Sequence, residues 1–266
     1  MINTYNETKL HKEIKEIFAQ KFNGKTEIEV ENYICDIVCH DENSTIIEIQ
    51  TANLSKLKSK IEALTRNHKV KLVYPLATTT YLQRQDENGK ILSKRKSPKK
   101  KNIYSIFGEL FSLYQFFDNP NFSLIVVPIE QCIIKTVFPE PVQTPNKKRR
   151  FKKDWLITDK ILLDYKDEII FNSKNDFQNL LPKEIPEVFS SKDLKNTEVK
   201  NEANKMIWVL KKAKIIEQCD KKGNLILYKK KTSRNNLAFQ EAFSRIKCFN
   251  SYQLSSISSS SRFCIA

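Results

Sequence analysis

Residues 33–51 read YICDIVCHDENSTIIEIQT, which is two apolar runs separated by a polar turn. The runs, at 33–40 and 45–51, are rich in the β-branched residues that favour strands, and the DENS between them has the composition of a turn. Both faces of the first run are largely apolar, as in a strand that is buried on both sides of a sheet. This stretch therefore predicts a β-hairpin inside a sheet.

The sequence on either side of this hairpin predicts further helices and strands. Apolar residues recur at helical spacing in some segments and form short strand-like runs in others. The expected elements are a helix at 6–22, a strand at 26–30, a helix at 53–67, a strand at 70–75, a helix at 103–117 and strand material at 122–137. This order predicts an α/β fold, in which helices cover the faces of a mixed sheet.

The predicted hairpin carries two carboxylates, Asp36 and Glu48. Alternation along the second strand puts Glu48 and Gln50 on one face, and pairing of the strands lets Asp36 and Glu48 project together. Two close, buried carboxylates favour a divalent cation, and oxygen ligands favour Mg²⁺ or Mn²⁺. The backbone carbonyl of Ile49 can complete the protein ligands. Glu13, at the edge of the apolar stripe of the first helix, is the acidic residue of that helix best aimed at the sheet.

A helical glutamate, a strand aspartate and the E-I-Q of residues 48–50 together resemble the PD-(D/E)XK nuclease superfamily, over about residues 5–135. The resemblance implies a restriction-endonuclease-like core that hydrolyses phosphodiester bonds with Mg²⁺. It also implies that Asp36 and Glu48 bind the metal, and that Glu13 holds a second cation or orients water.

Gln50 departs from the pattern of the superfamily, which has lysine at this position. Some restriction enzymes of the superfamily carry E-x-Q, and the resemblance then gives Gln50 the role of positioning the water or the scissile phosphate. Lys56, Lys58 and Lys60 on the following helix are candidates to supply the missing cation. The chain is also similar to an uncharacterised bacterial family that has this core followed by a winged helix.

The positive charge of the chain is concentrated in one part of the sequence. The 266 residues carry a net charge of +15, of which residues 91–153 hold +9, whereas residues 1–90 are neutral. Dense basic blocks repel themselves and are stabilised by a polyanion, so we expect DNA as the partner. The expected contacts in the two blocks are Lys94, Arg95, Lys96, Lys99, Lys100, Lys147, Lys148, Arg149 and Arg150.

The C-terminal part of the sequence predicts helix, turn, helix and a two-stranded ribbon, which resembles a winged helix-turn-helix. From its second helix we expect Lys200, Asn201, Asn204 and Lys205 to contact DNA. The predicted domains are a nuclease-like core at 1–137, a basic linker at 138–153, a winged-helix domain at 154–231 and a polar, Ser-rich, partly disordered tail at 232–266.

Several other classes of protein are disfavoured by the sequence. The longest apolar run, at 122–129, is too short to cross a bilayer, and residues 1–9 lack a signal-peptide core. The six cysteines form no CxxC pair, and His11, His40 and His68 lack a Ser or Cys partner at the spacing of a hydrolase triad. We therefore expect a cytoplasmic protein with no membrane contact.

The leading functional hypothesis is a Mg²⁺- or Mn²⁺-dependent DNA endonuclease of restriction type, in which a winged helix places the DNA. Cleavage of both strands favours a homodimer, because the substrate is symmetric. One alternative is a non-catalytic DNA-binding regulator that uses the winged helix and the basic loops. Another alternative is a protein-interaction scaffold on the same fold.

Overall fold

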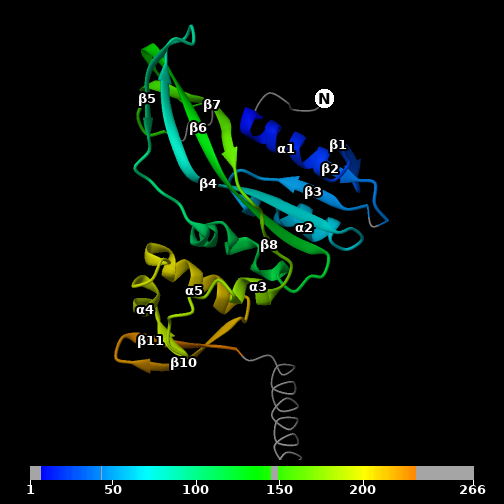
Figure 1. Ribbon diagram of the computed structural model, residues 1–266, viewed down its shortest axis with the longest axis vertical. Helices are drawn as coiled ribbons and strands as arrows, with labels where there is room; N and C mark the ends of the chain where they lie inside the picture. The colour runs from blue at the N-terminus through cyan, green and yellow to red at the C-terminus, as the bar shows by residue number, and fades with distance from the viewer. Residues whose placement is uncertain (1–6, 43, 145–148, 232–266) are drawn as a thin grey trace, which may run out of the picture.

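The computed structural model describes residues 7–42, 44–144 and 149–231. Their backbone forms an eight-stranded mixed sheet and a smaller three-stranded antiparallel sheet, with short helices between the strands (Figure 1). This confirms the mixed α/β class predicted from the sequence. No helix in these residues is long and apolar enough to span a membrane. The Ser-rich tail at 232–266 lies outside the described residues.

The first part of the chain follows the predicted order of elements. They are α1 (Lys9–Lys21), β1 (Gly24–Val30), β2 (Tyr33–Cys39), β3 (Ile46–Ile49), the 3-10 helix η2 (Leu54–Leu57), α2 (Lys58–Leu64), β4 (Val70–Gln85) and β5 (Ile91–Lys96). Helix α1 begins after Thr8, whose hydroxyl caps the free N–H of His11.

The second part of the chain contains short 3-10 helices, long strands and a group of small elements. They are η3 (Ile103–Gly108), η4 (Leu110–Ser112), η5 (Tyr114–Phe116), β6 (Phe122–Val142), β7 (Lys153–Tyr165), β8 (Ile169–Phe171), α3 (Lys174–Gln178), β9 (Val188–Ser190), α4 (Ser191–Lys195), η6 (Lys200–Glu202), α5 (Ala203–Lys212), β10 (Ile216–Lys222) and β11 (Leu225–Lys230).

The large sheet has the strand order β1-β2-β3-β4-β6-β7, with β5 paired to β4 and β8 paired to β6. Strands β1, β2 and β3 are antiparallel neighbours, β4 is parallel to both β3 and β6, and β7 is antiparallel to β6. The pairs Ile37–Ile47 and Val38–Ile46 confirm the hairpin predicted at 33–51.

Two apolar layers cover the two faces of the large sheet. Leu10, Ile14 and Phe18 of α1 pack on one face, against a cluster that includes Ile47 of β3 and Val73 of β4. On the other face, a larger cluster joins the sheet to α2, to the segment from η3 to η5 and to the small sheet. The small sheet is therefore held to the large one by a continuous apolar core.

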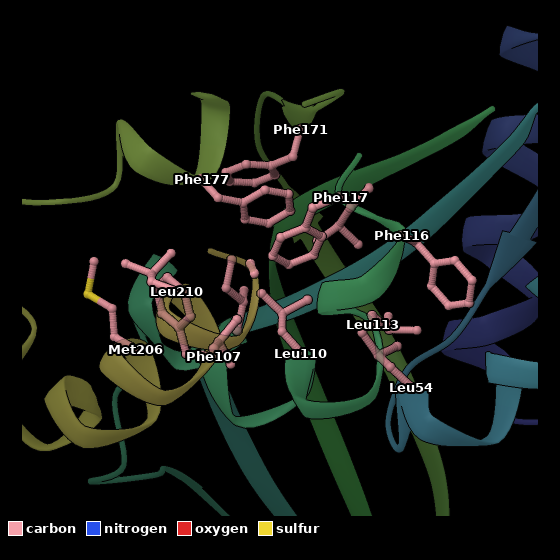
Figure 2. Packing of buried hydrophobic residues seen from close by; sticks show 14 of the residues in the cluster. Leu54, Phe107, Leu110, Leu113, Phe116, Phe117, Phe171, Phe177, Met206 and Leu210 are labelled. Carbon is pink, nitrogen blue, oxygen red and sulfur yellow. The ribbon is translucent and has the colours of Figure 1, made fainter. Parts of the chain in front are cut away.

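The segment at 103–117 forms three separate 3-10 turns rather than the expected single helix. Its aromatic and β-branched residues are weak helix formers, and Gly108 lies in the middle of the segment. Phe107, Phe116 and Phe117 are all buried in the larger cluster, so packing rather than helix propensity decides the path of this segment (Figure 2).

The segment at 138–153, expected to be a linker, instead contains the end of β6 and the start of β7, which pair through Val142 and Lys153. The prolines suggested a linker because proline has no N–H to donate to a strand ladder. Pro139 and Pro141 are tolerated here because they lie between Val137 and Val142, where β6 forms no pair with β7. Strand β7 also carries residues 154–165 into the large sheet, although they were expected to begin the winged helix.

Three phenylalanines hold α3 against β8 of the large sheet and against the segment after η5. The ring of Phe177 in α3 stacks at 3.6 Å on Phe117, which follows η5, and at 4.7 Å on Phe171 of β8 (Figure 2). Phe177 is only 1% exposed, so its ring is surrounded by other side chains of the core. The stack therefore fixes the position of α3 at the start of the small elements that follow β8.

We predict that Phe177→Ala lowers the free energy of unfolding by about 3–5 kcal/mol, because it leaves a cavity in the shared core. Urea unfolding followed by circular dichroism measures this loss. Phe151→Ala is the matched control, since Phe151 is 68% exposed, and it should change stability by no more than about 0.5 kcal/mol. Equal losses in the two variants would contradict this account of the core.

Candidate functional site

The site forms where β2 and β3 stop pairing. Asp36 lies one residue beyond the last pair, Ile37–Ile47, and its Oδ2 atom accepts the backbone N–H of Ile49 at 2.8 Å. In return, Oε1 of Glu48 accepts the backbone N–H of Asp36 at 3.3 Å. Each carboxylate thus satisfies a backbone donor that the opened ladder leaves free. The structure therefore brings Asp36 and Glu48 together, as the sequence predicts.

An irregularity in the neighbouring strand changes the direction of β2 at Asp36. Regular alternation would put Cys35 and Ile37 on one face, but Cys35 belongs to the larger cluster and Ile37 to the cluster beneath α1. Opposite Asp36, between the pairs Thr26–Ile37 and Ile28–Cys35, Glu27 has a left-handed backbone with φ of 56°. Asp36 thus lies at a local break in the sheet, where its carboxylate can turn toward β3.

Lys60 of α2 supplies the cation of the site. Its Nζ lies 2.6 Å from Oε2 of Glu48 and donates to the carbonyl oxygen of Ile34, also at 2.6 Å. Glu48 is 3% exposed and the Lys60 side chain 14%, so the ion pair is largely shielded from water. Lys56 and Lys58 are exposed. Of the three candidate lysines, Lys60 therefore contacts the predicted glutamate.

Helix α1 contributes a histidine that the sequence reasoning missed. His11 Nε2 lies 3.6 Å from Oδ1 of Asp36 and 3.4 Å from Oε1 of Glu7. Lys15, one turn farther along, pairs with Glu7 at 2.7 Å and with Glu27 of β1. His11 and Lys15, four residues apart in α1, lie on one face of the helix, and Glu7 immediately precedes its N-cap Thr8. The i, i+4 spacing of His11 and Lys15 was the available signal.

Burial and charge shift the acid–base properties of the site. Burial raises the pKa of Glu48 to about 7, and the nearby charge of Asp36 adds to this effect against the opposing charge of Lys60. Burial also disfavours an ionised Asp36, but the contacts from His11 and from the Ile49 N–H outweigh burial and hold the pKa of Asp36 below its usual value. Asp36 is therefore ionised at neutral pH, whereas Glu48 exchanges its proton near neutrality.

Glu13 and Gln50 do not join this group. Oε2 of Glu13 accepts the backbone N–H of Leu162 in β7 at 3.2 Å, so its carboxylate faces the opposite side of α1 from His11. Glu13 therefore does not contact Asp36 or Glu48, because the helix is rotated away from the expected orientation. The Gln50 amide donates to the carbonyl of Ala52 at 2.5 Å, within its own loop.

The donor atoms of the site match the chemistry of a hard divalent cation. Within 7–42, 44–144 and 149–231, no group of three or more His, Cys, Asp and Glu side chains is arranged to hold a metal ion. Asp36 and Glu48 offer two carboxylates, and the Ile49 carbonyl faces the same gap, because the N–H and C=O of one strand residue point to the same edge. Mg²⁺ typically binds one or two carboxylates and keeps several waters, so this oxygen set fits Mg²⁺ or Mn²⁺.

The structure divides the first basic block between the two faces of β5. Arg95 pairs across the ladder with Leu82 and lines a hollow with it, together with Lys99. Lys94 and Lys96, on either side of Arg95, instead lie over the ring of Tyr81 at 6.0 and 5.8 Å. Alternation along the strand therefore separates neighbouring cations of the same block.

The other predicted DNA contacts lie apart from one another, near α5 and in the second basic block. Lys100 lines a hollow of about 380 Å³ with Lys200 and Asn201, so the first basic block meets the segment before α5. Asn204 lines a separate hollow of about 370 Å³, whereas Lys205 is paired to Glu202 at 2.8 Å.

In the second basic block, Arg149 lies 4.5 Å from the ring of Trp155, and Arg150 lies 5.2 Å from the ring of Phe151. Lys147 and Lys148 lie outside the described residues.

We predict that Lys60→Met destabilises the protein by about 1–1.5 kcal/mol near pH 8, because Glu48 without its partner must keep a proton that it has lost in the native protein. Near pH 5 Glu48 is protonated in the folded protein, since its pKa is about 7, and the loss should be much smaller. Urea unfolding at the two pH values measures both losses. Lys58→Met, on the exposed side of α2, is the control. A loss that is the same at both pH values would contradict the ion pair.

Comparison with known proteins gives the family of the chain. Residues 8–172 match a family described as a domain of unknown function, DUF8091. This match ends one residue after β8, so it spans the whole large sheet and leaves out the small one. An uncharacterized protein from Treponema pallidum (strain Nichols) is 30% identical over 235 residues, which cover 88% of this chain and 90% of that protein. No solved structure matches the chain. The chain therefore belongs to the DUF8091 family.

Proposed function

We propose that this protein is a metal-dependent nuclease that hydrolyses phosphodiester bonds of DNA at Asp36, Glu48 and Lys60. The observation that carries the proposal is the contact between Lys60 Nζ and Glu48 Oε2 at 2.6 Å, beside Asp36, where β2 and β3 separate. Two carboxylates and one lysine are the chemical groups of the PD-(D/E)XK pattern. Here the lysine comes from α2 instead of from position 50.

The order of elements supports the same proposal. The resemblance implies a helix, three strands, a helix and a further strand, with the aspartate on the second strand and the glutamate on the third. The chain has α1, antiparallel β1, β2 and β3, then α2 and the parallel strand β4, with Asp36 on β2 and Glu48 on β3. A restriction-endonuclease-like core is therefore the proposed fold of this part.

The residues of the site have distinct proposed roles. A bound Mg²⁺ or Mn²⁺ lowers the pKa of a water molecule and polarises a phosphate oxygen. Asp36, kept ionised, and Glu48, once it loses its proton, would hold that ion. Lys60, released in part from Glu48, would stabilise negative charge that develops on the phosphate. His11 is a positioning residue, because it acts on the substrate only through Asp36.

The small sheet supports a role in placing DNA. The order α3, β9, α4, α5, β10 and β11, in which β9 pairs with β11, agrees with a winged helix. Helix α5 would be the recognition helix, with Asn204 on its open side. Binding without cleavage, as in a DNA-binding regulator, remains the alternative function, and cleavage of both strands would favour a homodimer.

We predict that the protein cuts plasmid DNA in the presence of Mg²⁺ or Mn²⁺, and that Asp36→Asn, Glu48→Gln and Lys60→Met each lower the cleavage rate by about 100-fold or more. Lys58→Met should leave the rate unchanged, and Gln50→Ala should lower it less than Lys60→Met. Agarose gels of supercoiled, nicked and linear DNA measure the rates.

Both methylated and unmethylated plasmids serve as substrates in this assay. Cleavage that survives Asp36→Asn and Glu48→Gln would show that the activity comes from elsewhere. Salt-sensitive binding of every DNA without any cleavage would favour the regulator.

We predict that the affinity for Mn²⁺ rises about tenfold between pH 6 and pH 8, because the ion must displace the proton that Glu48 holds below its pKa of about 7. Isothermal titration calorimetry in two buffers of different ionisation enthalpy measures the affinity and the proton release. Glu48→Gln should remove the pH dependence and weaken binding. An affinity that is constant over this range would exclude Glu48 as a ligand.

A further inference from the structure

Part of the large sheet extends past α1 and forms an arm, made of residues 79–96, 130–142 and 153–160 (Figure 1). Two adjoining hollows lie on one face of this arm, and they share Leu82 and Arg95 as lining residues. The larger has a volume of about 450 Å³ and the smaller about 130 Å³. Together they form a groove, which we call the arm groove.

Cations gather around one aromatic ring at the smaller hollow. Lys135 Nζ lies 4.0 Å from the centre of the Trp155 ring, the Arg149 guanidinium 4.5 Å and Lys153 Nζ 5.4 Å. Arg149 also donates to the backbone carbonyl of Trp155 at 2.8 Å. The ring therefore orders cations from β6, from β7 and from the segment before β7 at one place.

These cations are not balanced by carboxylates. Among the described residues, Arg84 pairs with the exposed Asp154 at 3.1 Å, but Lys135, Arg95 and Arg149 form no ion pair. Burial lowers the pKa of Lys135, and the neighbouring Arg95 and Arg84 lower it further. The cluster is thus self-repelling, and a bound anion would relieve the repulsion.

The larger hollow has a different chemistry. Leu82 and Ile133 give it apolar walls, and Arg95, Lys99 and Lys101 line it as well. Its volume lies in the range of small-molecule sites, so it can hold a planar ring of the size of a nucleobase. An apolar hollow beside an anion site matches the alternation of base and phosphate along a nucleic acid.

The apolar walls favour an unpaired strand over a duplex. A duplex keeps its bases stacked inside and presents phosphates to a protein, so it would leave Leu82 and Ile133 without a partner. An unpaired strand exposes its bases, and proteins that bind such strands combine a cationic groove with apolar or aromatic contacts.

We propose that the arm groove binds an unpaired nucleic-acid strand, with a phosphate at Arg95, Lys135 and Arg149 and a base against Leu82 and Ile133. The site goes beyond the proposed nuclease activity and does not require it. DNA and RNA share the recognised chemistry. Lys9 at the start of α1 forms an ion pair with Asp159 of β7. The next residue, Lys160, pairs across the ladder with Ile133, which lines the groove. The inner end of the groove therefore lies beside α1.

Fluorescence anisotropy with labelled twelve-nucleotide oligomers tests the proposal on the full chain. The probes are oligo(dT), oligo(rU) and a duplex of equal length, in buffer with EDTA so that metal-dependent cleavage cannot contribute. Oligo(dT) or oligo(rU) should bind at least about tenfold more tightly than the duplex. The comparison of the two oligomers shows which sugar the groove prefers. Duplex affinity that falls as much as oligomer affinity in the variant with both Arg95→Gln and Lys135→Gln would overturn the proposal, because the groove would then not select an unpaired strand.

The arm offers a matched pair of variants. Arg95→Gln with Lys135→Gln should weaken oligomer binding at least about tenfold and reduce its salt dependence by about one to two ions. Lys94→Gln with Lys96→Gln removes the same charge from the opposite face of β5 and should change binding less than about threefold. Equal losses in the two double variants would mean that net charge, not the groove, binds the strand.

Two further measurements separate the parts of the proposal. Inorganic polyphosphate should compete poorly for the oligomer, and competition as strong as that of oligo(dT) would overturn the base site. Trp155 and Trp208 are the two tryptophans of the chain, so in Trp208→Phe the oligomer should quench the remaining fluorescence. Oligomer binding is measured in EDTA and does not depend on cleavage, so a failure of the nuclease proposal and a failure of this one are distinguishable.

Discussion

The contact between the Asp36 carboxylate and the N–H of Ile49 allows β2 and β3 to separate without leaving buried backbone donors free. A side chain takes the place that a backbone carbonyl has elsewhere in the ladder. The Glu48 carboxylate likewise accepts the N–H of Asp36, so a side chain from each strand satisfies a backbone donor of the other strand. The geometry of the site follows from these two hydrogen bonds, because the strands can separate here only if both carboxylates lie between them.

A buried pair of carboxylates needs compensation from neighbouring elements. Glu48 receives it from Lys60, which places α2 against the start of β2 through the carbonyl of Ile34. Asp36 receives it from His11, which is part of α1. Helices on opposite faces of the sheet are thus drawn to one point by charge as well as by apolar packing. The pKa of Glu48 stays near 7 because this compensation is incomplete.

The sequence was sufficient for features that depend on local pattern. The hairpin, the flanking helix and the meeting of Asp36 with Glu48 follow from alternation and turn composition. The choice between Glu13 and His11 depends on the rotation of α1, which is set by contacts with β7 about 150 positions away in the chain. The sequence did not predict the β6–β7 pairing, because Pro139 and Pro141 are typical of a linker. Only the structure shows that they lie in a stretch of β6 that is not paired with β7.

The spatial distribution of positive charge likewise depends on contacts between distant parts of the chain. Sequence counts show two basic blocks, but they cannot show that β5 and β7, at the two sides of β4 and β6, bring them to one arm. Nor can they show that Arg95 and Lys94 face opposite sides of the same strand. Helix α1 stands between the two polar regions, with Lys9 on the groove side and His11 on the side of Asp36. A strand bound in the groove as proposed would therefore meet the N-terminal end of α1 before it could approach the carboxylates.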